Sequence, residues 1–136
     1  MTIALVSSAI GTGQKALAQT CGTTTDKPNV IIILADDLGY GDLECYGAKN
    51  VQTPNINKLA QSGIRFTNGH AVAATSTPSR YSLLTGEYAW RREGTDVAAG
   101  NAGMIIKPSQ FTMADMFKSR GYATCAIGKW HLGLGD

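Results

Sequence analysis

Residues 29–35, NVIIILA, contain after Asn29 a continuous run of apolar and mostly β-branched side chains. The run does not alternate with polar residues, which is typical of a strand buried on both faces in a parallel sheet with helices on each side. The polar, glycine-rich stretch DDLGYGD follows at residues 36–42. Binding groups tend to lie at the carboxyl end of such a strand, so we expect a functional loop there.

Helix and strand patterns then alternate along the chain. Thr53 is suited to cap a helix that has Pro54 in its first turn and ends at Gly63. Residues 64–67 alternate as in a strand, and a helix is predicted over residues 78–84.

A further helix and strand follow. Thr112 is suited to begin a helix, with Asp115 at the capping-box position and Gly121 at its end. Residues 122–127 are predicted as a strand, and they lead into another polar loop. Because strands alternate with helices, the predicted fold class is α/β with a mainly parallel sheet.

Composition limits the kinds of partner. The chain has 136 residues, of which 43% are hydrophobic and 16% are charged, with a net charge of +2. This is enough for one small domain with a core. The small, scattered charge gives no case for nucleic acid, and no apolar run is long enough for a membrane span.

The first 28 residues differ from the rest. Residues 1–18 contain a short apolar stretch followed by small residues at 16–18, which predicts a signal peptide and export. No Lys or Arg precedes the apolar stretch, so an unstructured tail is the alternative. Residues 19–28 are polar and contain Pro28, and we interpret them as a linker.

Polar groups gather in three loops that follow or flank the predicted strands. They are two carboxylates, a hydroxyl, a guanidinium, an ammonium and an imidazole, from Asp36, Asp37, Ser76, Arg80, Lys129 and His131. Carboxylates bind hard cations through oxygen, and cationic side chains neutralise an anion. The set is suited to handling a tetrahedral anion beside a metal ion.

Three blocks resemble the sulfatase family. The sequence STPSR at residues 76–80, followed by LTG at 84–86, is similar to its first signature, and GKWHLG at 128–133 is similar to its second. Asp36 and Asp37 resemble its metal-binding pair. One short motif alone is weak, but three in order are specific.

The resemblance runs from about Pro28 to Asp136 and implies an alkaline-phosphatase-like α/β/α sandwich with a mainly parallel sheet. Residues 29–136 would be the N-terminal part of the catalytic domain, truncated. Because the domain would be truncated, its sheet would be incomplete. The metal site would be incomplete as well, because the family takes further Ca²⁺ ligands from later in its sequence. An inactive, non-catalytic fragment is therefore one alternative function.

The resemblance implies that Ser76 is oxidised to formylglycine, whose hydrated form has two hydroxyls. One attacks sulfur and expels the alcohol, and the other, once deprotonated, collapses to the aldehyde and releases the sulfate. Asp36, Asp37 and residue 76 would bind Ca²⁺. Asp36 and Asp37 could also be a solvated turn, and Ser76 could be a helix cap.

The same resemblance implies roles for the basic residues. Arg80, four residues after Ser76 and therefore one helical turn away from it, would hold the diol. Lys129 would bridge the diol and the sulfate, and His131 would take a proton from the diol. Lys129 and His131, two residues apart, would share one face of an extended segment. Trp90 and its arginine neighbours could line a sugar-sulfate pocket or form a solvated loop.

The implied function is hydrolysis of sulfuric esters, of a sulfated small molecule or glycan, with carbohydrate sulfates expected. In the family that it resembles, serine at the position of Ser76 occurs in bacteria and implies a radical-SAM sulfatase-maturing enzyme as partner. The predicted signal peptide implies a periplasmic or secreted location. A phosphate or phosphonate ester hydrolase of the same superfamily is the other alternative.

Overall fold

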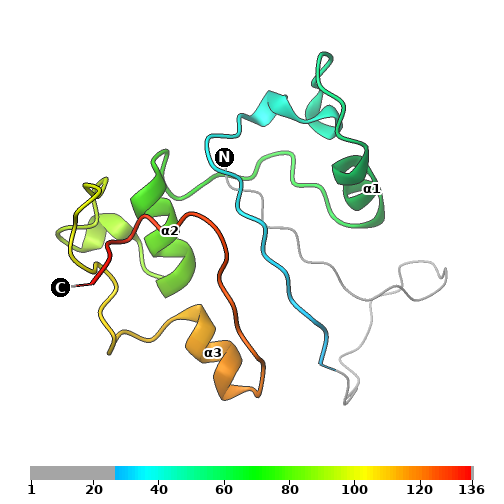
Figure 1. Cartoon of the computed structure of the whole chain (residues 1–136). Helices are drawn as coiled ribbons and strands as arrows, with labels where there is room; N and C mark the ends of the chain where they lie inside the picture. The colour runs from blue at the N-terminus through cyan, green and yellow to red at the C-terminus, as the bar shows by residue number, and fades with distance from the viewer. Residues whose placement is uncertain (1–26, 136) are drawn as a thin grey trace. The chain divides into compact units, whose positions relative to one another are not determined.

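The computed structural model describes residues 27–135. The predicted signal peptide, residues 1–18, and most of the linker, residues 19–28, lie outside the described part. Three α-helices are present, α1 (Pro54–Ser62), α2 (Ser76–Thr85) and α3 (Met113–Ser119) (Figure 1). Three short 3-10 helices, η1 to η3, span Tyr40–Asp42, Glu44–Tyr46 and Ala89–Arg91. No helix among the described residues is long and apolar enough to cross a membrane.

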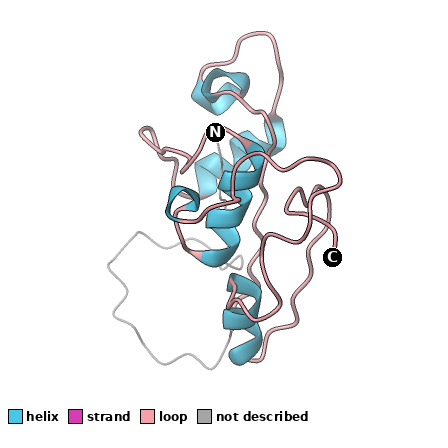
Figure 2. Cartoon of the chain, turned by 90° about the vertical axis from the view of Figure 1, so that its left-hand side faces the viewer, coloured by secondary structure: helices cyan, strands magenta, loops and turns pink. Residues whose placement is uncertain are grey.

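Within residues 27–135 there is no β-strand, so the strands predicted at 29–35, 64–67 and 122–127 are wrong for this chain (Figure 2). Exposure still alternates along 29–35: Ile31 is 62% exposed and its neighbours are less so. That alternation fits an extended backbone. A strand needs a second segment to accept and donate its backbone hydrogen bonds, and none of the described segments does this for 29–35.

The chain divides into two compact units, one ending at Gly69 and one beginning at His70. In the N-terminal unit, the Thr53 and Pro54 prediction for the start of α1 is confirmed. Thr53 does not cap the helix with its own side chain. Instead the Glu44 carboxylate accepts hydrogen bonds from the Thr53 amide (2.5 Å) and from Nδ2 of Asn57 (2.7 Å), which joins η2 to α1.

The C-terminal unit is built around α2. Its core consists of Tyr81, Ala89, Ile106 and Leu132, with Leu84 and Ile105 packed against them. The C-terminal segment passes beside α2 (Figure 1), and three backbone hydrogen bonds join residues 102–105 to residues 132–135. The segment that contains the second signature is therefore fixed against the helix that contains the first.

Helix α3 begins as predicted. Thr112 is its N-cap, the Thr112 hydroxyl accepts from the Asp115 amide, and the Asp115 carboxylate accepts from the Thr112 amide (2.9 Å). The Thr112 hydroxyl also donates to this carboxylate, and these bonds lower the pKa of Asp115. The capping box is local in sequence, which is why the sequence pattern could predict it.

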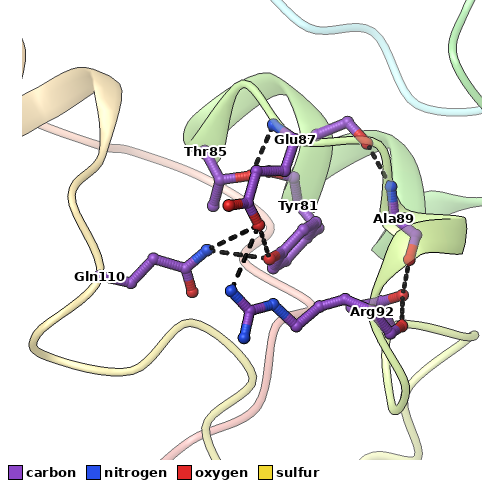
Figure 3. A network of polar contacts seen from close by, with 8 residues as sticks. Tyr81, Thr85, Glu87, Ala89, Arg92 and Gln110 are labelled. Atoms are coloured by element: carbon purple, nitrogen blue, oxygen red, sulfur yellow. Dashed lines mark hydrogen bonds and ion pairs between the residues drawn. The ribbon is translucent and has the colours of Figure 1, made fainter.

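A polar network lies over the end of α2 (Figure 3). The fully buried Tyr81 donates its hydroxyl proton to Oε2 of Glu87 (2.8 Å) and accepts from Nε2 of Gln110 (2.9 Å). Arg92 lies 3.5 Å from the same Glu87 oxygen. The hydrogen bond from Tyr81, followed by the charge of Arg92, holds the pKa of Glu87 below its ordinary value of 4.5.

The Tyr81→Phe variant is expected to lose less stability in acid than the unmodified chain. Because the pKa of Glu87 is lowered on folding, its ionised form stabilises the fold above its ordinary pKa, and this contribution is lost as pH falls through the folded value. Removing the Tyr81 hydroxyl removes the main cause. Urea midpoints between about pH 6 and pH 3 measure the effect.

Tyr88→Phe is the matched control for this experiment, because Tyr88 is 50% exposed and lies outside the Glu87 network. Its acid dependence should equal that of the unmodified chain, including the part due to Asp115. Equal acid slopes in Tyr81→Phe and Tyr88→Phe would contradict the role given to the Tyr81 hydroxyl.

Candidate active site

Ser76 is the first residue of α2, preceded by Thr75 as the N-cap with an extended backbone. The helix thus begins two residues before the predicted start at Pro78. Proline fits in a first turn because the amides there have no partner within the helix. The amide of Ser79 is bonded back to the Thr75 carbonyl (3.3 Å). The Ser76 hydroxyl therefore lies at the positive end of a ten-residue helix, a position that favours anions.

Arg80 joins the two signatures. Its Nε donates to the Ser76 hydroxyl (2.8 Å), as the separation of one helical turn predicted. Its terminal Nη1 donates to the Lys129 carbonyl (2.7 Å). One guanidinium therefore contacts the predicted nucleophile and fixes the backbone of the second signature next to it.

His131 has a left-handed backbone, with φ of 51°. The expectation that Lys129 and His131 share one face of an extended segment is therefore wrong, since alternation holds only for extended residues. The His131 Nε2 lies 3.0 Å from the Ala98 carbonyl oxygen. Its other nitrogen, Nδ1, is buried and has no hydrogen-bond partner among the described residues.

The contact with Ala98 determines which nitrogen of the neutral His131 imidazole carries the proton. A carbonyl oxygen only accepts hydrogen bonds, so Nε2 of His131 must donate to Ala98. Nδ1 then has a lone pair, and it is the nitrogen able to take a proton.

Asp36 and Asp37 belong to the N-terminal unit. Both are exposed on the loop after residues 29–35, and Asp37 has a left-handed backbone with φ of 56°. Adjacent carboxylates supply the oxygen donors that Ca²⁺ prefers, although two are fewer than the six to eight it takes. Among residues 27–135, no group of three or more His, Cys, Asp or Glu side chains could hold a metal ion. The predicted metal set with Ser76 stays a prediction.

The loop after α2 presents an aromatic surface. Trp90 is 73% exposed and stacks on Tyr88, with 5.7 Å between ring centroids. The Arg91 guanidinium lies 5.1 Å from the Trp90 ring centroid. Arg92 instead contacts Glu87. Trp90 and Arg91 thus form an exposed cluster on this loop, whereas Arg92 belongs to the polar network around Glu87.

No sequence pattern predicted one buried group beside the site. Thr77 is fully buried, and its hydroxyl contacts the backbones of Ala98 and His131. It fills the variable position of the first signature, and its partners are 21 and 54 residues away, too far for any local pattern to reveal.

Comparison with known proteins gives a consistent family. The sequence model described as "Sulfatase" matches residues 28–136. The chain is 60% identical over 114 residues to an N-acetylgalactosamine-6-O-sulfatase of Bacteroides thetaiotaomicron, covering 84% of this chain and 22% of that protein.

Mammalian relatives agree. Identity is 46% over 120 residues to steryl-sulfatase of Mus musculus, covering 83% of this chain and 19% of the relative. It is 44% over 111 residues to arylsulfatase A of Homo sapiens, covering 79% of this chain and 22% of the relative. The chain thus spans about a fifth of the length of these relatives. Since the family model matches most of the chain, which contains both signatures joined through Arg80, the chain belongs to the sulfatase family.

Proposed function

We propose that the protein containing this chain hydrolyses sulfate esters, with residue 76 as the nucleophile. The observation that carries the proposal is the double contact of Arg80, with the Ser76 hydroxyl at 2.8 Å and the Lys129 carbonyl at 2.7 Å. A sulfate monoester is a tetrahedral anion. The N-terminus of α2, together with cations at Arg80 and Lys129, provides the positive surroundings that such an anion needs.

Formylglycine at residue 76 is part of the proposal. When hydrated it supplies two hydroxyls on one carbon. One would attack sulfur and displace the alcohol, and the other would lose its proton so that the aldehyde re-forms and sulfate leaves. Serine has one hydroxyl, so it lacks the second function. His131 would remove the proton through Nδ1, because Nε2 is engaged with Ala98. Arg80 would hold the hydroxyl groups in position from one turn along α2.

Ca²⁺ completes the proposed site. Asp36, Asp37 and residue 76 would bind it, with more ligands from elsewhere in the whole protein. Bound there, the ion would orient the sulfate oxygens and offset their charge. Lys129 would contact the sulfate, in keeping with the hydrogen bond that brings its backbone to Arg80.

The name of the bacterial relative supports a proposal for the substrate class. That relative is named for the 6-O-sulfate of N-acetylgalactosamine. We propose a sulfated carbohydrate as substrate for this protein as well. A radical-SAM maturing enzyme would oxidise Ser76 before export to the periplasm or the medium.

The test is to express the chain with a radical-SAM sulfatase-maturing enzyme and to analyse its tryptic peptides. Trypsin cleaves after Arg65 and Arg80, so Ser76 falls in the peptide of residues 66–80. We expect this peptide to lose about two mass units, the two hydrogens removed when the alcohol becomes an aldehyde. Fragmentation should place the loss at residue 76, and a hydrazine probe should label it.

Two controls define the outcome. Ser119→Ala, in α3, should leave the mass loss intact, whereas Ser76→Ala should abolish it. In the whole protein, aryl sulfate should be cleaved much faster than aryl phosphate. Preference for the phosphate ester, or full activity in Ser76→Ala, would overturn the proposal.

A further inference from the structure

The buried hydroxyl of Thr77 connects three segments of the C-terminal unit. It donates to the His131 carbonyl oxygen (3.0 Å) and accepts from the Ala98 amide (3.0 Å). These directions are fixed, because a carbonyl oxygen only accepts and an amide N–H only donates. The hydroxyl has no exposed surface, so water does not compete for either bond.

The His131 side chain closes this arrangement into a ring. Its Nε2 donates to the carbonyl of Ala98, the same residue whose amide donates to Thr77. Thr77 therefore holds the backbone of His131 directly and holds the acceptor for its imidazole indirectly. His131 also has a left-handed φ of 51°, which is unfavourable for a residue with a Cβ and is maintained only by such contacts.

We propose that Thr77 is a positioning residue that fixes the His131 imidazole as the Nε2–H tautomer and leaves Nδ1 free to take a proton. The catalytic part of this inference rests on the function proposed above. Its structural part, the tautomer and its dependence on Thr77, does not.

Another buried threonine offers a matched comparison. Thr95 is 5% exposed, and its hydroxyl lies within hydrogen-bond distance of the carbonyls of Ala89 (2.6 Å) and Arg92 (2.8 Å). Those partners are three and six residues away, so Thr95 only closes its own loop. Thr95→Val removes a buried hydroxyl as Thr77→Val does, but it leaves the hydrogen bonds among Thr77, Ala98 and His131 unchanged.

The first measurement is nitrogen-edited NMR of the ring nitrogens in the 136-residue chain, at about pH 8, where imidazole is neutral. The chain has two histidines, so His70 serves as the internal reference. We expect His131 as the Nε2–H tautomer with a protected ring proton. An Nδ1–H tautomer in the unmodified chain would overturn the proposal.

The variants test the dependence on Thr77. Solvent exchange of the His131 ring proton should speed up at least about tenfold in Thr77→Val and change less than about twofold in Thr77→Ser and Thr95→Val. Equal exchange in the two valine variants would overturn the proposal. If Thr77→Val does not fold, the test uses Thr77→Ser, where loss of protection despite the retained hydroxyl would count against it.

Kinetics of the matured whole protein give an independent readout. Thr77→Val should lower kcat at least about tenfold with KM within about twofold, because a misplaced base affects the proton transfer more than binding. Thr77→Ser should restore kcat, and Thr95→Val should leave it unchanged. An unchanged kcat in Thr77→Val would overturn the inference. Absence of all sulfate turnover would instead overturn the proposed function, and the NMR result would still decide the role of Thr77.

Discussion

Replacing Gly133 with alanine is expected to lower the free energy of unfolding by about 2–5 kcal/mol, the sum of backbone strain and overpacking. Gly133 has a φ of +80°, which costs a residue with a Cβ about 1–2 kcal/mol. The added Cβ would also overlap the Gly103 carbonyl and lie 3.0 Å from the Ala102 carbonyl oxygen. Both atoms are backbone and cannot rotate away, which adds about 1–3 kcal/mol. Urea denaturation measures the loss.

Gly135 provides the control for this prediction. Its φ is +77°, but a Cβ there would meet nothing within 4 Å. Gly135→Ala should therefore lose only the backbone part, about 1–2 kcal/mol. If the two variants unfold at the same urea concentration, the close approach of residues 102–103 to Gly133 does not exist in solution.

The Leu132→Ala variant is expected to lose about 2–5 kcal/mol, as for other buried leucines that leave a cavity. Leu132 has no exposed surface and packs in the core with Tyr81, Ala89 and Ile106. Its carbonyl also accepts from the Ile105 amide (2.9 Å), so the backbone around the cavity is held and cannot collapse fully. The change in the urea midpoint at constant m-value measures the effect.

Leu134, two residues further along, is 80% exposed. Leu134→Ala should change the free energy of unfolding by less than about 0.5 kcal/mol, as is usual for surface positions. A larger loss at Leu134 than at Leu132 would show that the segment is rotated relative to the arrangement described.

Local signals predicted the helices well and the strands poorly. The start of α1 at Thr53 and Pro54 and the capping box of Thr112 and Asp115 depend on residues within one turn, so the sequence contains all that is needed. A strand at residues 29–35 depends on a distant partner as well as on its own apolar side chains. The α/β expectation thus describes the family better than it describes the chain alone.

In the candidate site too, contacts between residues close in sequence were predicted, and contacts between distant residues were not. The separation of one helical turn placed Arg80 at Ser76 correctly. The two-residue separation of Lys129 and His131 led to the wrong prediction that both lie on one face of an extended segment. It failed because the left-handed backbone of His131 is set by its surroundings. The contacts of Thr77 with Ala98 and His131 join residues that no short pattern relates.

The two contacts of Arg80 explain why arginine and not lysine suits this position. The guanidinium is a planar fork, and two of its nitrogens donate in different directions, to the Ser76 hydroxyl and to the Lys129 carbonyl. An ammonium group would carry the same charge but would reach from a single point. The position therefore requires two donor nitrogens held a fixed distance apart on one side chain, in addition to a positive charge.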